Sequence, residues 1–208
     1  MKRGPAYTVG FAVAVGVACA ALLTAGRAIT AERRAANQRA ERARSILRVL
    51  GIPTSVRTER VDPDTGRTVV TERPASNDEI LERFERSVRE RPLAGRPAYW
   101  TDDAVAVPFS GKGLWGVIRG FVALAPDLET VRRVTFYKHS ETPGLGAEIE
   151  TPGFRNQFRG MPVPERAGRV DLDIQAITGA TMTSQRVEAM LERTLAEVVG
   201  PAEDGDGG

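Results

Sequence analysis

The chain of 208 residues has few of the side chains that build most metal and redox centres, because it contains one cysteine and one histidine. A single cysteine, Cys19, excludes an intramolecular disulfide and a zinc site built on cysteines. A single histidine, His139, excludes a metal centre with several histidine ligands, and a Ser-His-Asp triad would have to use that residue. We therefore expect no metal site, and a chain with one histidine and no catalytic cluster gives no catalytic residue to expect.

Charge is distributed unevenly along the chain, although the formal net charge is only +2. The first 50 residues carry nine Lys or Arg and two Glu, whereas residues 51–208 carry 20 basic and 25 acidic residues. The part that can fold is therefore acidic, and the basic excess belongs to the N-terminal segment. A basic nucleic-acid-binding domain is excluded on this ground, and we expect no nucleic-acid partner.

A stretch of 23 residues from Gly4 to Gly26 contains no charged side chain. About 20 apolar residues suffice to span a membrane as a helix, so residues 1–26 are predicted to be a short tail and a transmembrane anchor. A cleaved signal peptide is the first alternative, but the apolar run is long and no Ala-x-Ala site follows it. The second is a lipoprotein beginning at Cys19, for which Gly16 is a poor fit three positions earlier.

The rest of the chain has the patterns of an α+β domain. Residues 27–50 lack Gly and Pro and are predicted to form a solvated helical stalk after the anchor. Residues 51–199 are predicted to form one domain with an antiparallel sheet and a C-terminal helix, and residues 200–208 an acidic, disordered tail. The elements expected within the domain are a hairpin at 56–61 and 67–72, a helix opened by the capping box Ser76-x-x-Glu79, half-buried strands at 104–108, 117–125 and 131–139, a region of mainly loop at 143–168, and a helix whose apolar stripe runs from Val187 to Val198.

Three segments of the domain are candidates for function. Ile177–Ser184 precedes the last helix, and the N–H groups at a helix N-terminus can bind phosphate, although its Thr and Ser residues also suit ordinary caps. His139–Glu150 follows a strand and combines Pro and Gly with polar residues, as ligand-carrying loops and simple turns both do. Ser110–Gly116 contains Gly-Lys but is not a nucleotide phosphate loop, because the first Gly that such a loop requires is absent upstream of Gly111.

These segments together resemble the FMN-binding domain family. Thr-Gly-Ala-Thr-x-Thr-Ser at 178–184 resembles that family's flavin attachment site, and Glu-Thr-Pro-Gly-Leu-Gly at 141–146 is typical of its respiratory members. Residues 110–115 and 123–131, with the stretch up to Arg48, are similar to the C-subunit family of Na⁺-translocating NADH:quinone reductases. The G-subunit family of Rnf electron-transport complexes shares the flavin motif and the 141–146 loop, and it remains an alternative.

The resemblance implies an electron-transfer subunit with FMN joined through a phosphodiester to the hydroxyl of Thr181. On this resemblance, we expect the subunit to have no complete enzyme activity alone and to work with other membrane subunits and with a flavin transferase that attaches FMN. The resemblance assigns further flavin contacts to two groups of residues, which are Thr178, Gly179, Ala180, Met182 and Thr183 in the motif, and Glu141, Thr142, Gly144, Leu145 and Gly146 in the loop. The cofactor would carry the redox chemistry, and the protein would set its position.

Two features depart from the simplest form of this interpretation. The family motif usually has Asp three residues before its first Thr or Ser, where this chain has Gln175, and Asp173 lies two residues earlier. A membrane-anchored assembly or binding domain without flavin is therefore a second hypothesis.

The Arg residues after Gly26 also favour a cytoplasmic domain by the positive-inside rule. The resemblance instead implies a single-pass inner-membrane protein whose FMN domain lies on the extracytoplasmic side, and we follow the resemblance.

Overall fold

The computed structural model describes residues 4–61, 66–163 and 170–200. Most of the predicted turn at 62–66 and of the predicted tail at 200–208 lies outside these residues. The chain divides into two compact units, Met1–Arg39 and Ala40–Gly208. Helix α1 (Pro5–Leu50) supplies the first unit and enters the second at Ala40.

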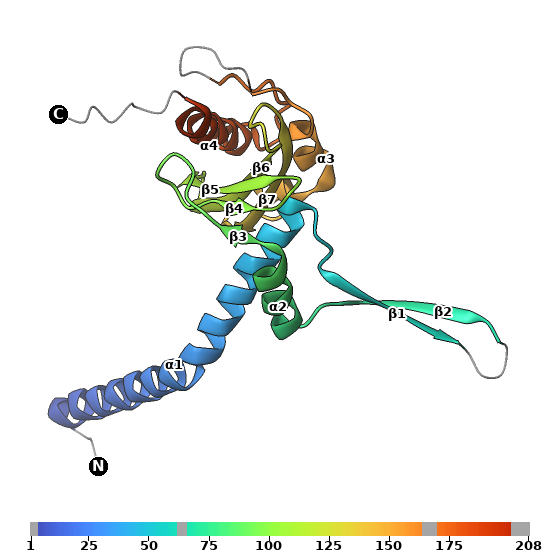
Figure 1. Cartoon of the computed structure of the whole chain (residues 1–208). Coiled ribbons are helices and arrows are strands. Elements are labelled where there is room, and N and C mark those ends of the chain that lie inside the picture. The colour runs from blue at the N-terminus through green and yellow to red at the C-terminus, as the bar shows by residue number, and fades with distance from the viewer. Residues whose placement is uncertain (1–3, 62–65, 164–169, 201–208) are drawn as a thin grey trace, which may run out of the picture. The chain divides into compact units, whose positions relative to one another are not determined.

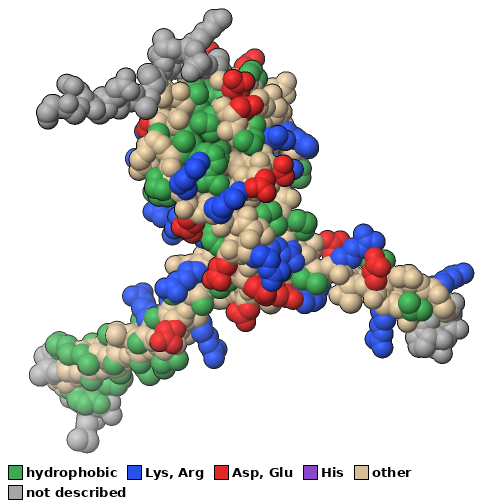
Figure 2. Space-filling model, viewed as in Figure 1, with side chains coloured by type: hydrophobic (Ala, Val, Ile, Leu, Met, Phe, Trp, Pro, Cys, Tyr) green, Lys and Arg blue, Asp and Glu red, His purple; other side chains and the backbone are tan. Residues whose placement is uncertain are grey.

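The first unit is helical, and its N-terminal half exposes large apolar side chains such as Phe11, Leu22 and Leu23. Hydrophobic side chains cover this part of α1 in Figure 2, and charged ones appear only further along the helix. Among the described residues, one helix is long and apolar enough to cross a membrane, with a mean hydropathy of 2.1 over 18 residues. Length and composition agree with the predicted anchor, although a signal sequence has the same properties.

The second unit is built on an antiparallel sheet of five strands that are neighbours in chain order (Figure 1). The strands are β3 (Arg89–Glu90), β4 (Tyr99–Trp100), β5 (Val105–Lys112), β6 (Val117–Leu124) and β7 (Val131–Lys138). With the long N-terminal helix and the C-terminal helix α4 (Thr181–Val199), this sheet confirms the predicted α+β class.

The sheet is covered on both faces, so the half-buried strands expected from period-two alternation are wrong for β6. Val107, Ile118 and Val122 pack with Val187 and Leu191 of α4 in one apolar cluster. A second cluster on the opposite face holds Ala106, Phe121 and Ala123, together with Ile46 and Leu47 of α1 and Ile80 of α2 (Asn77–Ser87). Because alternate residues of a strand point to opposite faces, β5 and β6 each supply residues to both clusters.

The C-terminal turns of α1 belong to the core and are not a solvated stalk. Ala40, Ala43, Ile46 and Leu47 are at most 5 % exposed, so the compact unit begins before the boundary expected at residue 51. The helix ends at Gly51, whose φ is +82°. The N–H of Gly51 donates to the carbonyl of Arg48 and that of Ile52 to Leu47, which is a Schellman motif and requires a left-handed residue at that point.

The region expected to be mainly loop contains short helices instead. They are η1 (Gly146–Glu150), α3 (Pro152–Arg155) and η2 (Asn156–Phe158). Ile149, Phe154 and Phe158 are at most 3 % exposed, and the apolar burial of these side chains holds turns that are too short for helical periodicity to reveal.

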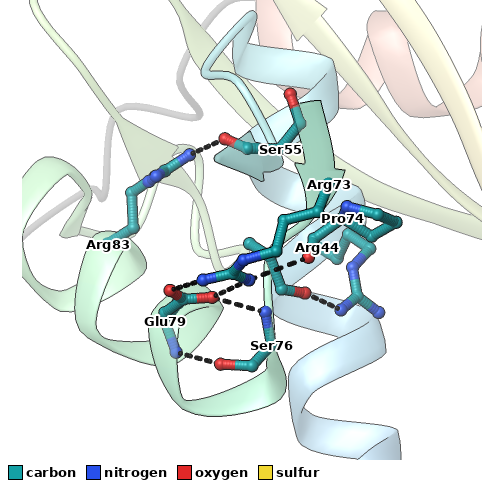
Figure 3. Close-up of polar contacts among 8 residues, drawn as sticks. Arg44, Ser55, Arg73, Pro74, Ser76, Glu79 and Arg83 are labelled. Carbon is teal, nitrogen blue, oxygen red and sulfur yellow. Dashed lines mark hydrogen bonds and ion pairs between the residues drawn. The ribbon is translucent and has the colours of Figure 1, made fainter. Parts of the chain in front are cut away.

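The predicted hairpin and capping box are confirmed. Strands β1 (Ser55–Val61) and β2 (Thr68–Pro74) pair in antiparallel register from Ser55–Pro74 to Val61–Thr68. Figure 3 shows how β2 joins α2: the Arg73 guanidinium donates to Glu79 at 2.6 Å, and Glu79 accepts from the N–H of Ser76 at 2.7 Å. The Ser76 hydroxyl accepts from the N–H of Glu79 at 3.2 Å, which completes the box.

We expect this contact to depend on pH. The Arg73 hydrogen bond, followed by the Ser76 N–H, lowers the pKa of Glu79 from 4.5 to about 2. A lowered carboxyl pKa stabilises the fold above pH 4.5, and that stabilisation is lost as the pH falls towards 2. Glu79→Gln should therefore lower the melting temperature at pH 7. This decrease should become progressively smaller as the pH falls from 5 to 2. Glu82→Gln, on the same helix, is the control, and an equal cost of Glu79→Gln at pH 7 and pH 3 would contradict the assignment.

Candidate functional site

The segment predicted to carry the attachment site forms a turn and the first turn of α4. The N–H of Ala180 donates to the carbonyl of Ile177 at 2.9 Å, and Gly179 has a φ of +81°, which favours glycine. Thr181 is the first residue of the helix and is exposed. The N-cap, Ala180, has no side chain that can cap, and the described residues supply no side-chain capping hydrogen bond at this end of α4.

The expectation that Thr183 or Ser184 caps this helix is wrong. The Ser184 hydroxyl accepts from the N–H of Ile177 at 3.0 Å and donates to the carbonyl of Ala180 at 3.1 Å, which fastens the turn to the helix. The Thr183 hydroxyl donates to Oε2 of Glu141 at 2.7 Å. Both residues are at most 1 % exposed, so their hydroxyls bond to groups in the protein interior and do not cap the helix.

Glu141 joins the three candidate segments. Its carboxylate is 5 % exposed and accepts from Thr183 through Oε2 and from the N–H of Trp115 through Oε1, at 2.7 and 3.1 Å. These donors come from α4 and from the turn between β5 and β6. The guanidinium of Arg186 on α4 also donates to the carbonyl of Gly113 in that turn. The two hydrogen bonds satisfy the buried carboxylate. Without Glu141, the Thr183 hydroxyl and the Trp115 N–H would each lose this acceptor.

Two glycines make room for this carboxylate. A β-carbon at Gly113 would collide with Oε1 of Glu141, and one at Gly146 would lie 2.8 Å from Oε2 and 3.0 Å from the Thr183 hydroxyl. Ser110–Gly116 therefore forms the end of β5 and the turn before β6, around Glu141. No helix follows it, in agreement with the exclusion of a nucleotide phosphate loop.

His139 shapes the loop. Its Nδ1 accepts from the N–H of Glu141 at 3.2 Å, which leaves the proton on Nε2, 3.1 Å from Oε1 of Glu150. This hydrogen-bonded position at the end of β7 is a structural one.

Large apolar side chains are exposed on the same three segments. Trp115 is 70 % exposed, Met182 53 %, Leu145 45 % and Leu114 40 %. A β-carbon at Gly179 would lie 3.1 Å from Leu145, which places this side chain beside the turn before α4. The sequence analysis did not assign Leu114 and Trp115 to the site, because no local sequence pattern shows that a side chain is exposed.

The structure brings some of the predicted contacts together and leaves others apart. Glu141, Gly146 and Thr183 lie in one buried cluster, and Leu145 lies against Gly179. The carbonyl of Thr142 accepts from the N–H groups of Leu145 and Ala147, so it serves the loop. The remaining predicted residues make no hydrogen bond to Glu141 or Thr183 in this cluster: Thr178, Ala180, Thr181, Met182 and Gly144. Gly144 has a φ of +73° and open space around it.

Gln175 lies before the motif in a segment without regular secondary structure and is exposed. The side-chain amide of Gln157 holds its backbone, donating to its carbonyl at 3.2 Å and accepting from its N–H at 2.7 Å. These bonds use only main-chain atoms of Gln175. An Asp at this position would therefore keep them, and the structure assigns the Gln side chain no internal role.

Residues 113–196 match the family model of the FMN-binding domain, so the class of domain expected from the motifs is confirmed. The matched range includes the turn between β5 and β6, the loop with Glu141 and the start of α4.

The chain is similar to C subunits of Na(+)-translocating NADH-quinone reductases from several organisms. The chain is 41% identical over 95 residues to the C subunit of the Na(+)-translocating NADH-quinone reductase of Pasteurella multocida, and 38% identical over 106 residues to that of Yersinia pestis. These matches cover 40% and 45% of this chain but only 36% and 40% of the relatives. The resemblance to this family of C subunits is confirmed, and it extends over about two fifths of each relative.

Two solved structures share the fold. The crystal structure of NqrC from Shewanella oneidensis matches with a TM-score of 0.54 and covers 78% of this chain and 94% of its own. The corresponding C subunit of the Na(+)-translocating NADH-quinone reductase from Parabacteroides distasonis matches with a TM-score of 0.51 and covers 80% and 93%. Both are 22% identical to this chain, so they support the architecture and not the details of the site.

The role of Glu141 can be tested by stability. Glu141→Ala leaves two buried donors without an acceptor and should lower the free energy of unfolding by about 1–3 kcal/mol. Glu141→Gln should cost less, because its amide oxygen can accept from Trp115 while its NH₂ group donates to Thr183. Chemical denaturation of the purified variants measures both. The control is Glu129→Ala at an exposed position; a Glu141→Ala cost no larger than the control's would show that the carboxylate does not hold these segments.

Proposed function

We propose that the protein is the electron-transfer C subunit of a Na⁺-translocating NADH:quinone reductase, with FMN joined covalently to Thr181. The observation that carries the proposal is an exposed threonine at the start of a helix whose N-cap has no side-chain partner. A phosphodiester there would keep one negative charge, which the partial positive charge of the helix N-terminus stabilises.

Burial supports Thr181 over its neighbours. Four hydroxyls compete in the motif, and those of Thr183 and Ser184 are buried and hydrogen-bonded. Thr178 and Thr181 are exposed, and only Thr181 lies in the helix, next to its first N–H groups. A transferase needs an accessible oxygen, so Thr183 and Ser184 are poor acceptors. The family motif then favours Thr181 over Thr178.

The exposed apolar side chains suit a flavin ring that stays accessible. We place the ring against Leu145 and Met182, with Trp115 and Leu114 available from the neighbouring turn. Bound FMN supplies the redox chemistry by accepting and donating electrons. The chain's own residues tether the phosphate, orient the ring and leave one side open to a donor and an acceptor in other subunits.

The attachment residue is tested by intact mass of the full chain made together with the flavin transferase of its host. Thr181→Ala should lose the added mass of FMN less one water, and with it the flavin fluorescence on a denaturing gel. Thr178→Val removes the other exposed hydroxyl and should keep both. Flavin that remains on Thr181→Ala would contradict the assignment, and its loss from Thr178→Val alone would place the attachment on Thr178.

The same measurement of intact mass tests the second hypothesis, that the domain carries no flavin. Its support is Gln175, which replaces the usual Asp. If unmodified wild-type protein is recovered and Gln175→Asp becomes flavinylated, the flavin is absent because of that position, and the proposal for the natural chain fails.

We also propose that residues 27–208 lie on the extracytoplasmic side of the inner membrane, after a single span. The support is the resemblance, against the count of Arg residues after the span. Alkaline phosphatase fused after Gly200 should be active in cells, because it folds only outside the cytoplasm, whereas a cytoplasmic reporter fused at that point should be inactive. The reverse pair of results would establish the cytoplasmic orientation.

A further inference from the structure

A cavity of about 310 Å³ lies among the end of α1, strand β7 and the short helices α3 and η2. In Figure 1 the C-terminal end of α1 lies beside α3, on the part of the unit where β7 passes. The lining residues are Arg48, Arg133, Val134, Thr135, Arg155, Asn156 and Arg159. None of them belongs to the candidate flavin site.

The lining is cationic and contains no acidic residue. Four of its seven residues are arginines, and none of the four has an ion pair within the described ranges. Guanidinium groups remain charged at any physiological pH. Four like charges around one half-enclosed space repel each other more strongly than they would in open water, so an anion in that space would be favoured.

Arg155 adds an independent sign of a ligand. Its Nε is buried and has no hydrogen-bond partner among the residues that the structure describes. A buried N–H of a charged group that pairs with nothing is costly, and proteins keep few of them. The residue belongs to α3 and lines the cavity, so an anion bound there would lie beside its guanidinium group.

Internal roles account for only part of the cluster. The Arg133 guanidinium lies against Gly51, at the C-terminus of α1, where a cation suits the helix dipole. The Thr135 hydroxyl already shares a hydrogen bond of 3.0 Å with Ser45. Arg48, Arg155 and Arg159 have no comparable internal role in the described part of the chain, and the amide of Asn156 adds a donor beside them.

We propose that this cavity binds an oxyanion of the phosphate class, either a free phosphate or the headgroup of a phosphate-bearing lipid. Guanidinium groups pair with phosphate through two parallel N–H donors, and several of them match a doubly charged, multidentate anion better than a single carboxylate. The volume is at the small end for ligand pockets, which suits one phosphate-sized group.

The full-length protein in detergent tests the site with inorganic phosphate and pyrophosphate at constant ionic strength. Thermal unfolding should shift upward and saturate with each, because a ligand that binds only the folded state stabilises it. Arg155→Gln/Arg159→Gln should weaken the apparent affinity by at least about tenfold, since hydrogen bonds to charged groups are the strong ones. Arg132→Gln/Arg193→Gln removes the same charge from exposed positions outside the cavity and should leave the affinity unchanged.

Dihexanoylphosphatidic acid, added below its micelle concentration, distinguishes the two sources. Tighter binding than inorganic phosphate would assign a lipid headgroup, and weaker binding a free phosphate. A shift that does not saturate, or that both double variants reduce equally, is a general salt effect and overturns the proposal. Should the cavity variant fail to fold, as judged by circular dichroism, Arg159→Gln alone replaces it, because Arg159 is exposed and its removal leaves no buried group unpaired.

Discussion

The arrangement of the candidate site depends on one buried carboxylate. Glu141 accepts hydrogen bonds from Trp115 and Thr183, which are 26 and 42 residues away in the chain. Local preferences cannot bring such distant segments together, and an apolar contact would not fix their register. A carboxylate with two directed acceptors does both, because any shift of either segment leaves a buried polar group unpaired. Gly113 and Gly146 are required to admit it, since a β-carbon at either position collides with it.

This construction suits a carrier whose cofactor is held by a covalent bond. A tightly bound flavin needs an enclosing pocket, and such a pocket would keep donor and acceptor away from the ring. Here the rigid part of the site lies beneath the surface, at Glu141, Thr183 and Ser184, and the apolar side chains above it are exposed. Attachment at Thr181 would supply the affinity that the open surface lacks, so position and accessibility need not compete.

The sequence predicted the elements whose signals are local. The box of Ser76 and Glu79, the hairpin and the stripe of α4 each depend on residues a few positions apart, and all three are present. The predicted solvated stalk is helical and exposed at residues 27–39, but its last turns are not solvated, because Ala43 and Leu47 pack in the core. The bonds of Thr183 could not be foreseen either, because a hydroxyl near a helix start suits a cap and a tertiary contact equally well, and burial decides between them.

The two proposed sites share one segment of chain, which runs from Glu141 through η1, α3 and η2 to Arg159. Coupling between them would require this segment to have two alternative arrangements. Its middle is fixed by Ile149, Phe154 and Phe158, whose side chains are almost fully buried in the cluster under α4. Close-packed apolar contacts resist the small displacements that would carry a signal from one end to the other. An anion among the arginines should therefore stabilise the fold without altering the flavin environment, as two sites on a common rigid support would behave.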